Sequence, residues 1–176
     1  MSQSMTPHNI DESRQLRQAL GRFATGVAVV TTCSPTGKLE GLTVNSFSSV
    51  SLEPALVLWS IQKAAPSLES FRSARHFAIN VLSVDQLKHC QHFSKKSVDK
   101  FLDIEHGPGL GGCPLFEGCV ATFECVTHDI LEEGDHFIFI GHVKRAACGA
   151  GDPLIFSAGS FCRPALFAEV DRQQNV

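Results

Sequence analysis

Short runs of strand-forming residues recur along the chain, and no long helix separates one run from the next. The first run, residues 27–32, holds three valines and two threonines, β-branched residues that favour strands. The turn residues Ser34, Pro35 and Gly37 follow it and predict a hairpin into a second strand over residues 39–44. Regular alternation of strands with long helices would indicate a doubly wound parallel sheet. Its absence favours a mostly antiparallel sheet closed into a barrel, which leaves no long edge exposed.

Further strands and three short helices complete the expected fold. The strands are expected over residues 55–61, 77–82, 120–128 and 136–144, with a last apolar piece at 154–156. The helices are expected over residues 12–22 with Asp11 as N-cap, after Pro66, and after Ser83. Gln86 lies three positions after Ser83 and completes a capping box. This box directs Leu87 and Cys90 inward. The prediction is a mainly β (α+β) fold with six or seven strands and flanking short helices.

The 176 residues fit one domain, which we expect over residues 11–166 between a flexible N-terminal tail at 1–10 and a C-terminal tail at 167–176. A net charge of −3 gives no electrostatic reason to expect nucleic-acid binding. No apolar stretch approaches the roughly 18 residues of a membrane span. Residues 1–14 are polar and lack the apolar region of a secretory signal. We therefore expect a cytoplasmic protein that binds neither membrane nor nucleic acid.

The seven cysteines are odd in number and form no C-x-x-C pair. Cys125 and others lie in apolar runs, where a free thiol behaves as a small hydrophobe, so we expect no disulfide framework. His89 and His92 are three apart on a helix, but a zinc site needs more ligands at defined spacings. Cys113 and Cys119 belong to no such pattern either. The sequence predicts no metal site.

Residues 107–112 match the dinucleotide-binding pattern G-x-G-x-x-G. That pattern binds pyrophosphate only where a strand enters the turn and a helix leaves it. Here a poor strand precedes it, and Cys113 and Pro114 follow, where a helix cannot easily begin. We interpret the run as part of a long loop over residues 95–114. No G-x-S-x-G sequence frames a nucleophilic serine either.

The segment 43–51 is the strongest candidate for a binding site. Six of its nine residues are small and polar: Thr43, Asn45, Ser46, Ser48, Ser49 and Ser51. Small hydroxyl side chains let a planar ligand approach closely. Asn45 offers a donor and an acceptor, which suits the alternating edge of a flavin pyrimidine ring. A polar strand face in solvent explains the same residues equally well.

Three other residues are weaker candidates for ligand binding. Ser67 follows Pro66 at a helix start, which suits a phosphate or a plain N-cap. Lys100 could add positive charge there or be one more solvated lysine. His136 ends a tight turn, and it could bind a nicotinamide amide or a pyrophosphate, or simply be exposed.

With these segments in order, the chain resembles the flavin reductase family with the FMN-binding split-barrel fold, the small reductase partners of two-component flavin monooxygenases. The resemblance runs from about residue 16 to residue 161. It is carried by residues 23–27, 41–52, 54–58, 77–82, 99–101, 134–141 and 153–156.

The resemblance implies a homodimer with a split β-barrel and flavin near the subunit interface. The isoalloxazine would be held by Asn45, Ser46, Phe47, Ser48 and Ser49, with Thr43 and Ser51 close by. The ribityl phosphate would lie toward Ser67, Phe93, Ser94 and Lys100. Nicotinamide would be faced by His136 and, at the end of the chain, by Phe161. The family often has an arginine before Gly159 and a tyrosine at position 161. This sequence has neither, so it departs from the family pattern for nicotinamide contacts at residues 157–161.

The implied reaction is hydride transfer from NADH or NADPH to FMN or FAD, with reduced flavin released to a partner monooxygenase. Because the cofactor carries the chemistry, the protein has to stack two rings and exclude competing reactions, and no catalytic residue is assigned. Flavin that must leave as a product is expected to bind weakly. Three alternatives remain: a non-catalytic FMN-binding electron carrier, an oxidase like pyridoxamine-phosphate oxidase, and an interaction module without cofactor.

Overall fold

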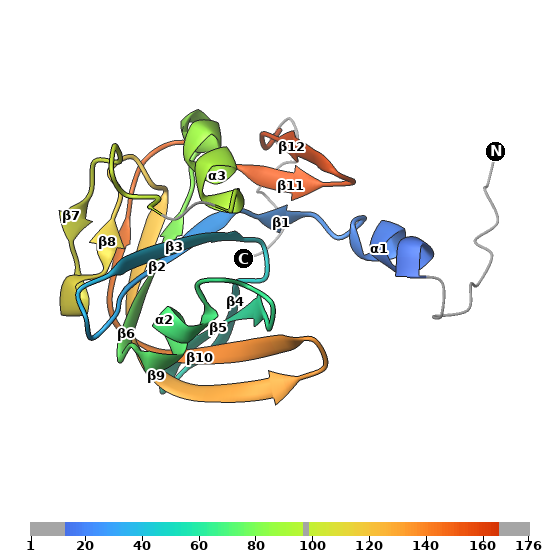
Figure 1. The fold of residues 1–176 in the computed structure, drawn as a ribbon. Helices are drawn as coiled ribbons and strands as arrows, with labels where there is room; N and C mark the ends of the chain where they lie inside the picture. Colours follow the sequence, from blue (N-terminus) through green and yellow to red (C-terminus); the bar gives the residue numbers. More distant parts are fainter. Residues whose placement is uncertain (1–12, 97–98, 166–176) are drawn as a thin grey trace, which may run out of the picture.

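The computed structural model describes residues 13–96 and 99–165, and its main feature is one seven-stranded antiparallel sheet (Figure 1). In spatial order its strands are β3 (Leu39–Val44), β2 (Ala28–Cys33), β6 (His76–Val81), β9 (Ala121–Glu133), β10 (His136–Cys148), β5 (Ala55–Gln62) and β4 (Ser48–Leu52). Every neighbouring pair in this order is antiparallel. The prediction of a mainly β, antiparallel fold is confirmed.

The predicted hairpin between the first two strands is present as β2 and β3, which pair from Ala28↔Val44 to Cys33↔Leu39. The last two long strands, β9 and β10, run further than their apolar pattern predicts. They form a hairpin that turns at Gly134, whose φ of +55° favours glycine. The short strand β4 is not predicted because serine has little strand preference. It forms by pairing with β5, and the register shifts between Ser49 and Ser51.

The three predicted helices are all present among the described residues. They are α1 (Ser13–Leu20), α2 (Leu68–Ser73) and the pair η1 (Val84–Gln86) and α3 (Leu87–Ser94). The capping box is confirmed, since the backbone N–H of Ser83 donates to Gln86 Oε1 at 3.0 Å. Cys90 is buried and Leu87 half-buried, as the box predicts. The expected cap Asp11 and the tails 1–10 and 167–176 lie outside the described residues.

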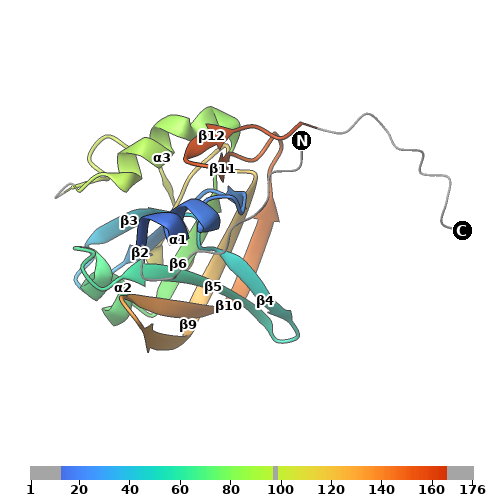
Figure 2. The same ribbon diagram turned by 90° about the vertical axis from the view of Figure 1, so that its right-hand side faces the viewer.

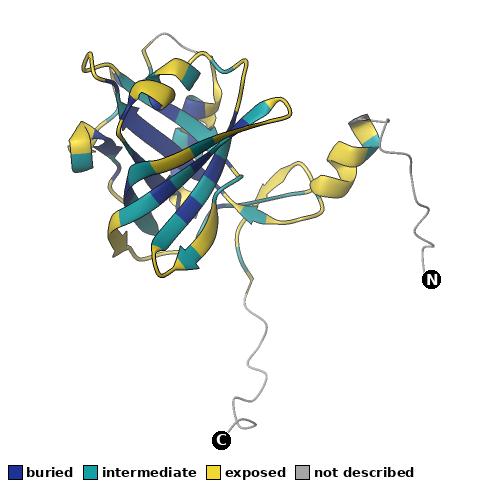
Figure 3. Ribbon diagram, turned by 90° about the horizontal axis from the view of Figure 1, so that it is seen from below, coloured by how far each residue is buried: buried dark blue, intermediate teal, exposed yellow. Residues whose placement is uncertain are grey.

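A smaller sheet of β1 (Thr25–Gly26), β11 (Ile155–Ser157) and β12 (Ser160–Cys162) lies beside the main one. Together with α1 it extends from the body of the molecule (Figures 1 and 3). The last apolar piece predicted at 154–156 is confirmed as β11, whereas β12 is not predicted because it is only three residues long. No helix among the described residues is both long and apolar enough to cross a membrane.

The glycine-rich run 107–112 is a loop, as interpreted. It contains β7 (Gly107–Pro108) and the helical turn η2 (Leu110–Gly112), and β8 (Pro114–Leu115) follows. Gly111 has a φ of +65°, and a Cβ there would lie 2.4 Å from Nδ1 of His76. The buried Glu124 carboxylate accepts a hydrogen bond from the backbone N–H of Leu110. These contacts pack the loop against β6 and β9 and explain Gly109 and Gly111 without a ligand.

Two apolar clusters fill the interior, and α3 covers one of them (Figure 2). The first is centred on Trp59, whose ring lies 4.8 Å from that of Phe139 and 4.9 Å from that of Phe71 in α2. The second is centred on Phe93 of α3, whose ring lies 5.2 Å from each of Phe101 and Phe116. The helices α2 and α3 are therefore fixed by aromatic packing on the sheet.

All seven cysteines are free, and four of them, Cys90, Cys113, Cys119 and Cys125, lie in the interior. Burial raises the pKa of Cys113 and of Cys119 to about 11, and that of Cys125 to about 12. An unfolded thiol loses its proton near 9.0, so above that pH the folded state binds more protons than the unfolded one. The contribution of these protonated thiols to the free energy of unfolding is therefore complete below pH 9. It is lost as the pH rises through the pKa values of the thiols in the folded state.

We expect the free energy of unfolding to fall between about pH 8.5 and pH 10.5, by on the order of 1–2 kcal/mol for each buried thiol. Urea denaturation under reducing conditions at both pH values measures this. Cys125→Ala should flatten the dependence, whereas Cys148→Ser, at an exposed position, should leave it unchanged. Equal slopes for wild type and Cys125→Ala would contradict the assignment.

Candidate functional site

The polar run 43–51 forms the crossing between the two edge strands of the main sheet. Thr43 lies in β3, residues 45–47 connect the strands, and Ser48, Ser49 and Ser51 lie in β4. The crossing is held against β5 by one side chain. Ser46 Oγ donates to the Ser60 carbonyl at 3.2 Å and accepts from the Ser60 N–H at 2.9 Å.

The side chains of the crossing divide into a fixed and an open set. Phe47 packs on the first apolar cluster, with its ring 5.3 Å from that of Phe123. Asn45, Ser48 and Ser49 are exposed. Ser48 Oγ donates only to the neighbouring Ser49 carbonyl, at 3.2 Å. The open amide and hydroxyl groups beside a fixed backbone are what a hydrogen-bonding planar ligand requires.

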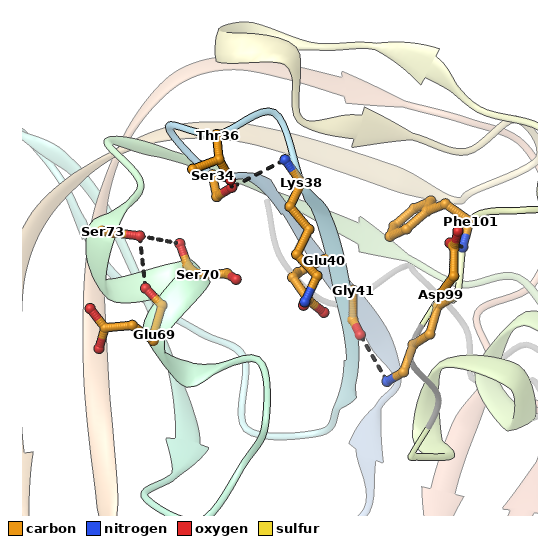
Figure 4. A network of polar contacts seen from close by, with 11 residues as sticks. Ser34, Thr36, Lys38, Glu40, Gly41, Glu69, Ser70, Ser73, Asp99 and Phe101 are labelled. Atoms are coloured by element: carbon orange, nitrogen blue, oxygen red, sulfur yellow. Dashed lines mark hydrogen bonds and ion pairs between the residues drawn. The ribbon is translucent and has the colours of Figure 1, made fainter.

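A second group of predicted residues meets where β3 contacts α3. Thr43 Oγ1 donates to the Cys90 carbonyl of α3 at 2.7 Å. Lys100 Nζ donates to the carbonyl of Gly41 at 3.1 Å (Figure 4). It also donates to the carbonyl of Phe93 at 2.9 Å. A Cβ on Gly41 would lie 2.6 Å from the Phe93 ring, so only glycine lets α3 approach this closely.

Lys100 is therefore not a solvated lysine. Its ammonium is half-buried, and burial lowers its pKa, while the nearby Glu40 carboxylate acts in the opposite direction. A lysine ammonium has three N–H donors, and two of them are used by the carbonyls. Among the described residues no further acceptor binds this ammonium, so the third N–H is open to a ligand in a direction that the first two bonds determine.

The surface beside Lys100 is hollowed and has both charged and apolar residues. Lys38 and Glu40 of β3 form an ion pair at 2.6 Å. In Figure 4 they lie between α2 on one side and the segment of Asp99 and Phe101 on the other. A cavity of about 410 Å³ is lined by Lys38, Leu39, Asp99, Phe101, Leu102 and His106. A ligand bound along β3 would reach this cavity next to Lys100.

Two further residues predicted near the phosphate behave differently from each other. Ser67 precedes α2 and is only 6% exposed, and its hydroxyl has no hydrogen-bond partner among the described residues. Ser94 is exposed, and its Oγ donates to the Gln91 carbonyl at 2.9 Å. The Phe93 ring is fully buried, so Phe93 can offer a ligand only its backbone.

His136 begins β10, and its Nδ1 donates to Asp135 Oδ1 at 2.6 Å. This hydrogen bond, with the charge of the imidazole, holds the pKa of the Asp135 carboxyl below its usual range. His136 pairs with Gln62 of β5, two residues beyond Ser60, which binds Ser46. The imidazole and the polar crossing therefore lie at the same end of β5.

Phe161 is not brought to the other residues within one chain. It lies in β12, 42% exposed, with its ring 5.3 Å from that of Phe156. β12 and the β9–β10 turn that carries His136 lie at opposite ends of the molecule in both Figure 1 and Figure 2. One chain cannot present both side chains to one nicotinamide ring.

Three residues that shape the site were not predicted in their structural roles. Ser60 holds the crossing through its backbone, and Gly41 makes room for Phe93. The Lys63 N–H donates to the Asp135 carbonyl at 2.9 Å and steadies the turn before His136. Ser60 and Lys63 act through backbone groups, which every residue type has, so the sequence could not indicate their roles. Gly41 is a glycine within a predicted strand, and this could have indicated that another part of the chain packs closely against it.

Comparison with known proteins gives one consistent result. The family model described as "Flavin reductase like domain" matches residues 20–165. An FMN reductase (NADH) of Agrobacterium fabrum is 46% identical over 153 residues, 87% of each chain. The reductase component of a flavin-dependent trigonelline monooxygenase of Acinetobacter baylyi is 40% identical over 89% of this chain, which spans only 50% of that relative.

Among solved structures, an NADH:FAD oxidoreductase of Streptomyces globisporus is similar with a TM-score of 0.87 and 39% identity. The match covers 94% of this chain and 100% of that one, and that structure is a complex with NAD and FAD fragments.

Proposed function

The chain belongs to the flavin reductase family, and on that premise we propose that it transfers hydride from NADH or NADPH to FMN or FAD and supplies the reduced flavin to a partner monooxygenase. The observation that carries the proposal is the β3–β4 crossing, a fixed backbone with open polar side chains beside the preoriented Lys100 ammonium. The relatives named as reductases of NADH and flavin support the same reaction.

Among the predicted residues, we propose two kinds of role. Asn45, Ser48 and Ser49 have groups free to bind the isoalloxazine edge, with Ser51 close by. Ser67 Oγ and the third N–H of Lys100 are available to the ribityl phosphate. Thr43, Ser46, Phe47, Phe93 and Ser94 are engaged within the fold and shape the site, contributing backbone groups at most.

The chemistry supplied by a bound flavin is acceptance of a hydride at its N5 atom. The protein's own residues position the two rings. The crossing, fixed on β5 through Ser46, would hold the flavin ring, and the His136 imidazole, oriented by Asp135, would offer its Nε2 to the nicotinamide. No described side chain has to exchange a proton for this transfer, which agrees with the absence of a paired acid and base in the sequence.

We propose that the main sheet closes as a split barrel. β3 and β4 occupy its two edges but are joined by residues 45–47 alone. A flat seven-stranded sheet would separate these edges by about 29 Å. Four residue steps span at most about 14 Å. The sheet must therefore curl strongly, and residues 11–166 form one domain around it.

We also propose that the chain works as a homodimer with flavin near the subunit interface. The apolar side chains Leu16, Leu20 and Phe23 on and after α1 are 42%, 64% and 78% exposed, which costs free energy in an isolated chain. A second copy would cover them. It would also allow Phe161 of one protomer to approach the His136 end of its partner. The cytoplasmic location remains a prediction from the sequence.

Steady-state oxidation of NADH and of NADPH, with FMN, FAD or riboflavin in excess, tests the reaction. We expect turnover with added free flavin and little flavin retained after purification. Protein that retains stoichiometric FMN and shows no turnover with added flavin would instead be an electron carrier. No turnover with any pair of substrates would refute the reductase assignment.

His136→Ala is expected to raise the KM for NADH about fivefold, the loss of one hydrogen bond, with little change in the KM for flavin. His128→Ala, at an exposed position on β9, is the matched control and should leave both constants unchanged. An unaltered KM for NADH in His136→Ala would contradict the role of this imidazole.

A further inference from the structure

A carboxylate lies beside the Lys100 ammonium, and the proposed reaction does not use it. Glu40 precedes Gly41 in β3, and the Gly41 carbonyl accepts a hydrogen bond from Lys100 Nζ at 3.1 Å. The Glu40 side chain is only 12% exposed, which is low for a charged group. Its ion-pair partner among the described residues is Lys38 Nζ, at 2.6 Å. Lys38 is 56% exposed, so solvent screens the charge of Lys38 more than that of Glu40.

The Glu40 carboxylate acts on Lys100 through its charge rather than through a hydrogen bond. The hydrogen bonds of the ammonium go to the carbonyls of Gly41 and Phe93. Burial lowers the pKa of Lys100, and the negative charge of Glu40 opposes this effect. Glu40 therefore helps to keep the lysine charged in the free protein. Because it takes none of the three donors, it leaves the remaining N–H open to a ligand.

The position of Glu40 makes it a neighbour of a phosphate bound at Lys100. In Figure 4 the side chains of Lys38 and Glu40 lie between α2 and the segment of Asp99 and Phe101. The ribityl phosphate is proposed to bind between the same two elements, with Ser67 before α2 on one side and Lys100 on the other.

A carboxylate and a phosphate repel each other, and the repulsion is stronger where a charge is largely out of water. The opposite charges of Lys38 and Glu40 offset each other only in part, because Lys38 is the more exposed of the two. The carboxylate that stabilises the Lys100 ammonium therefore opposes the anion that this ammonium attracts.

We propose that Glu40 lowers the affinity of the site for the flavin phosphate and thereby favours release of the reduced flavin. The inference rests on the proposed reductase function, in which flavin leaves as a product. Glu40 acts on binding and release, and it has no part in the hydride transfer itself.

Titration of oxidised FMN and of riboflavin, followed by quenching of flavin fluorescence, measures the two affinities without turnover. Glu40→Gln keeps the size of the side chain and removes its charge. We expect this variant to bind FMN about fivefold more tightly than wild type, the effect of one nearby charge in a partly screened site. The affinity for riboflavin, which has no phosphate, should be unchanged. The gain for FMN should shrink at high ionic strength, because salt screens the repulsion.

Two further variants are the controls. Glu40→Asp keeps the charge and should bind FMN as wild type does. Asp152→Asn removes the same unit of charge at an exposed position before β11, and it should also bind FMN as wild type does. Tighter FMN binding in Glu40→Gln alone therefore assigns the effect to the charge at position 40.

Glu40→Gln that binds FMN no more tightly than wild type, or that gains affinity for riboflavin by the same factor, would overturn the proposal. Equal affinity of wild type for FMN and riboflavin would also overturn it, since Glu40 would then have no phosphate contact to oppose. None of these results depends on NADH. A failure of the reductase assignment would appear instead as absence of turnover in a protein that still binds flavin.

Discussion

Asn80→Ala is expected to lower the free energy of unfolding by about 3–4 kcal/mol, because the loss of buried hydrogen bonds adds to the loss of packing. The Asn80 side chain is fully buried in β6. Its Nδ2 donates to the Val29 carbonyl at 3.2 Å, and to Thr31 Oγ1 and the Pro114 carbonyl at 3.3 Å. Its Oδ1 accepts from the Phe116 N–H at 3.0 Å.

One amide therefore joins β2, β6 and the segment that follows the glycine-rich loop. Removing it leaves the Phe116 N–H buried without a partner, and an unpaired buried donor costs about 1–3 kcal/mol by itself. Urea denaturation of the variant measures the effect. Asn45→Ala, at an exposed asparagine, is the control and should change stability by less than about 0.5 kcal/mol. A loss in Asn80→Ala no greater than that of the control would contradict the role of Asn80.

Lys100→Met is expected to raise the KM for FMN about thirtyfold, the loss of a charge-assisted hydrogen bond to phosphate. The side chain keeps its length and apolar stem, so the packing between Phe93 and β3 is largely retained. Two carbonyls lose their donor, and the free energy of unfolding should fall by about 1–2 kcal/mol. Steady-state kinetics and denaturation measure the two effects separately.

Riboflavin distinguishes contact with the phosphate from a general disturbance of the site, because it has no phosphate. The KM for riboflavin should change much less than that for FMN in Lys100→Met. Lys95→Met, at an exposed lysine after α3, should leave both unchanged. An equal rise for FMN and riboflavin would show that Lys100 only shapes the site.

The sequence predicted the strands that carry β-branched or apolar residues and missed those that do not. β2, β3, β5 and β6 begin or end within one residue of the expected positions. β4 is rich in serine and forms through its partner β5, so its existence depends on tertiary pairing. β9 and β10 are longer than their apolar residues predict, because the two strands pair with each other along their full length.

The candidate site was predicted as a set of residue types, but their division into roles came only from the structure. Ser46 and Thr43 have the same small polar chemistry as Ser48 and Ser49, yet their hydroxyls are bound within the fold. Lys100 could not be told from a solvated lysine, because its partners are two backbone carbonyls, which carry no residue-type signal, and one of them, that of Gly41, is distant in sequence.

The most direct test of the central claim is a single turnover without oxygen. Protein mixed anaerobically with FMN and NADH should bleach the visible absorbance of the flavin and form one NAD⁺ for each flavin reduced. The rate should depend on protein concentration and should fall in Lys100→Met at low FMN. Flavin that stays oxidised, or that is reduced no faster than without protein, would contradict the account.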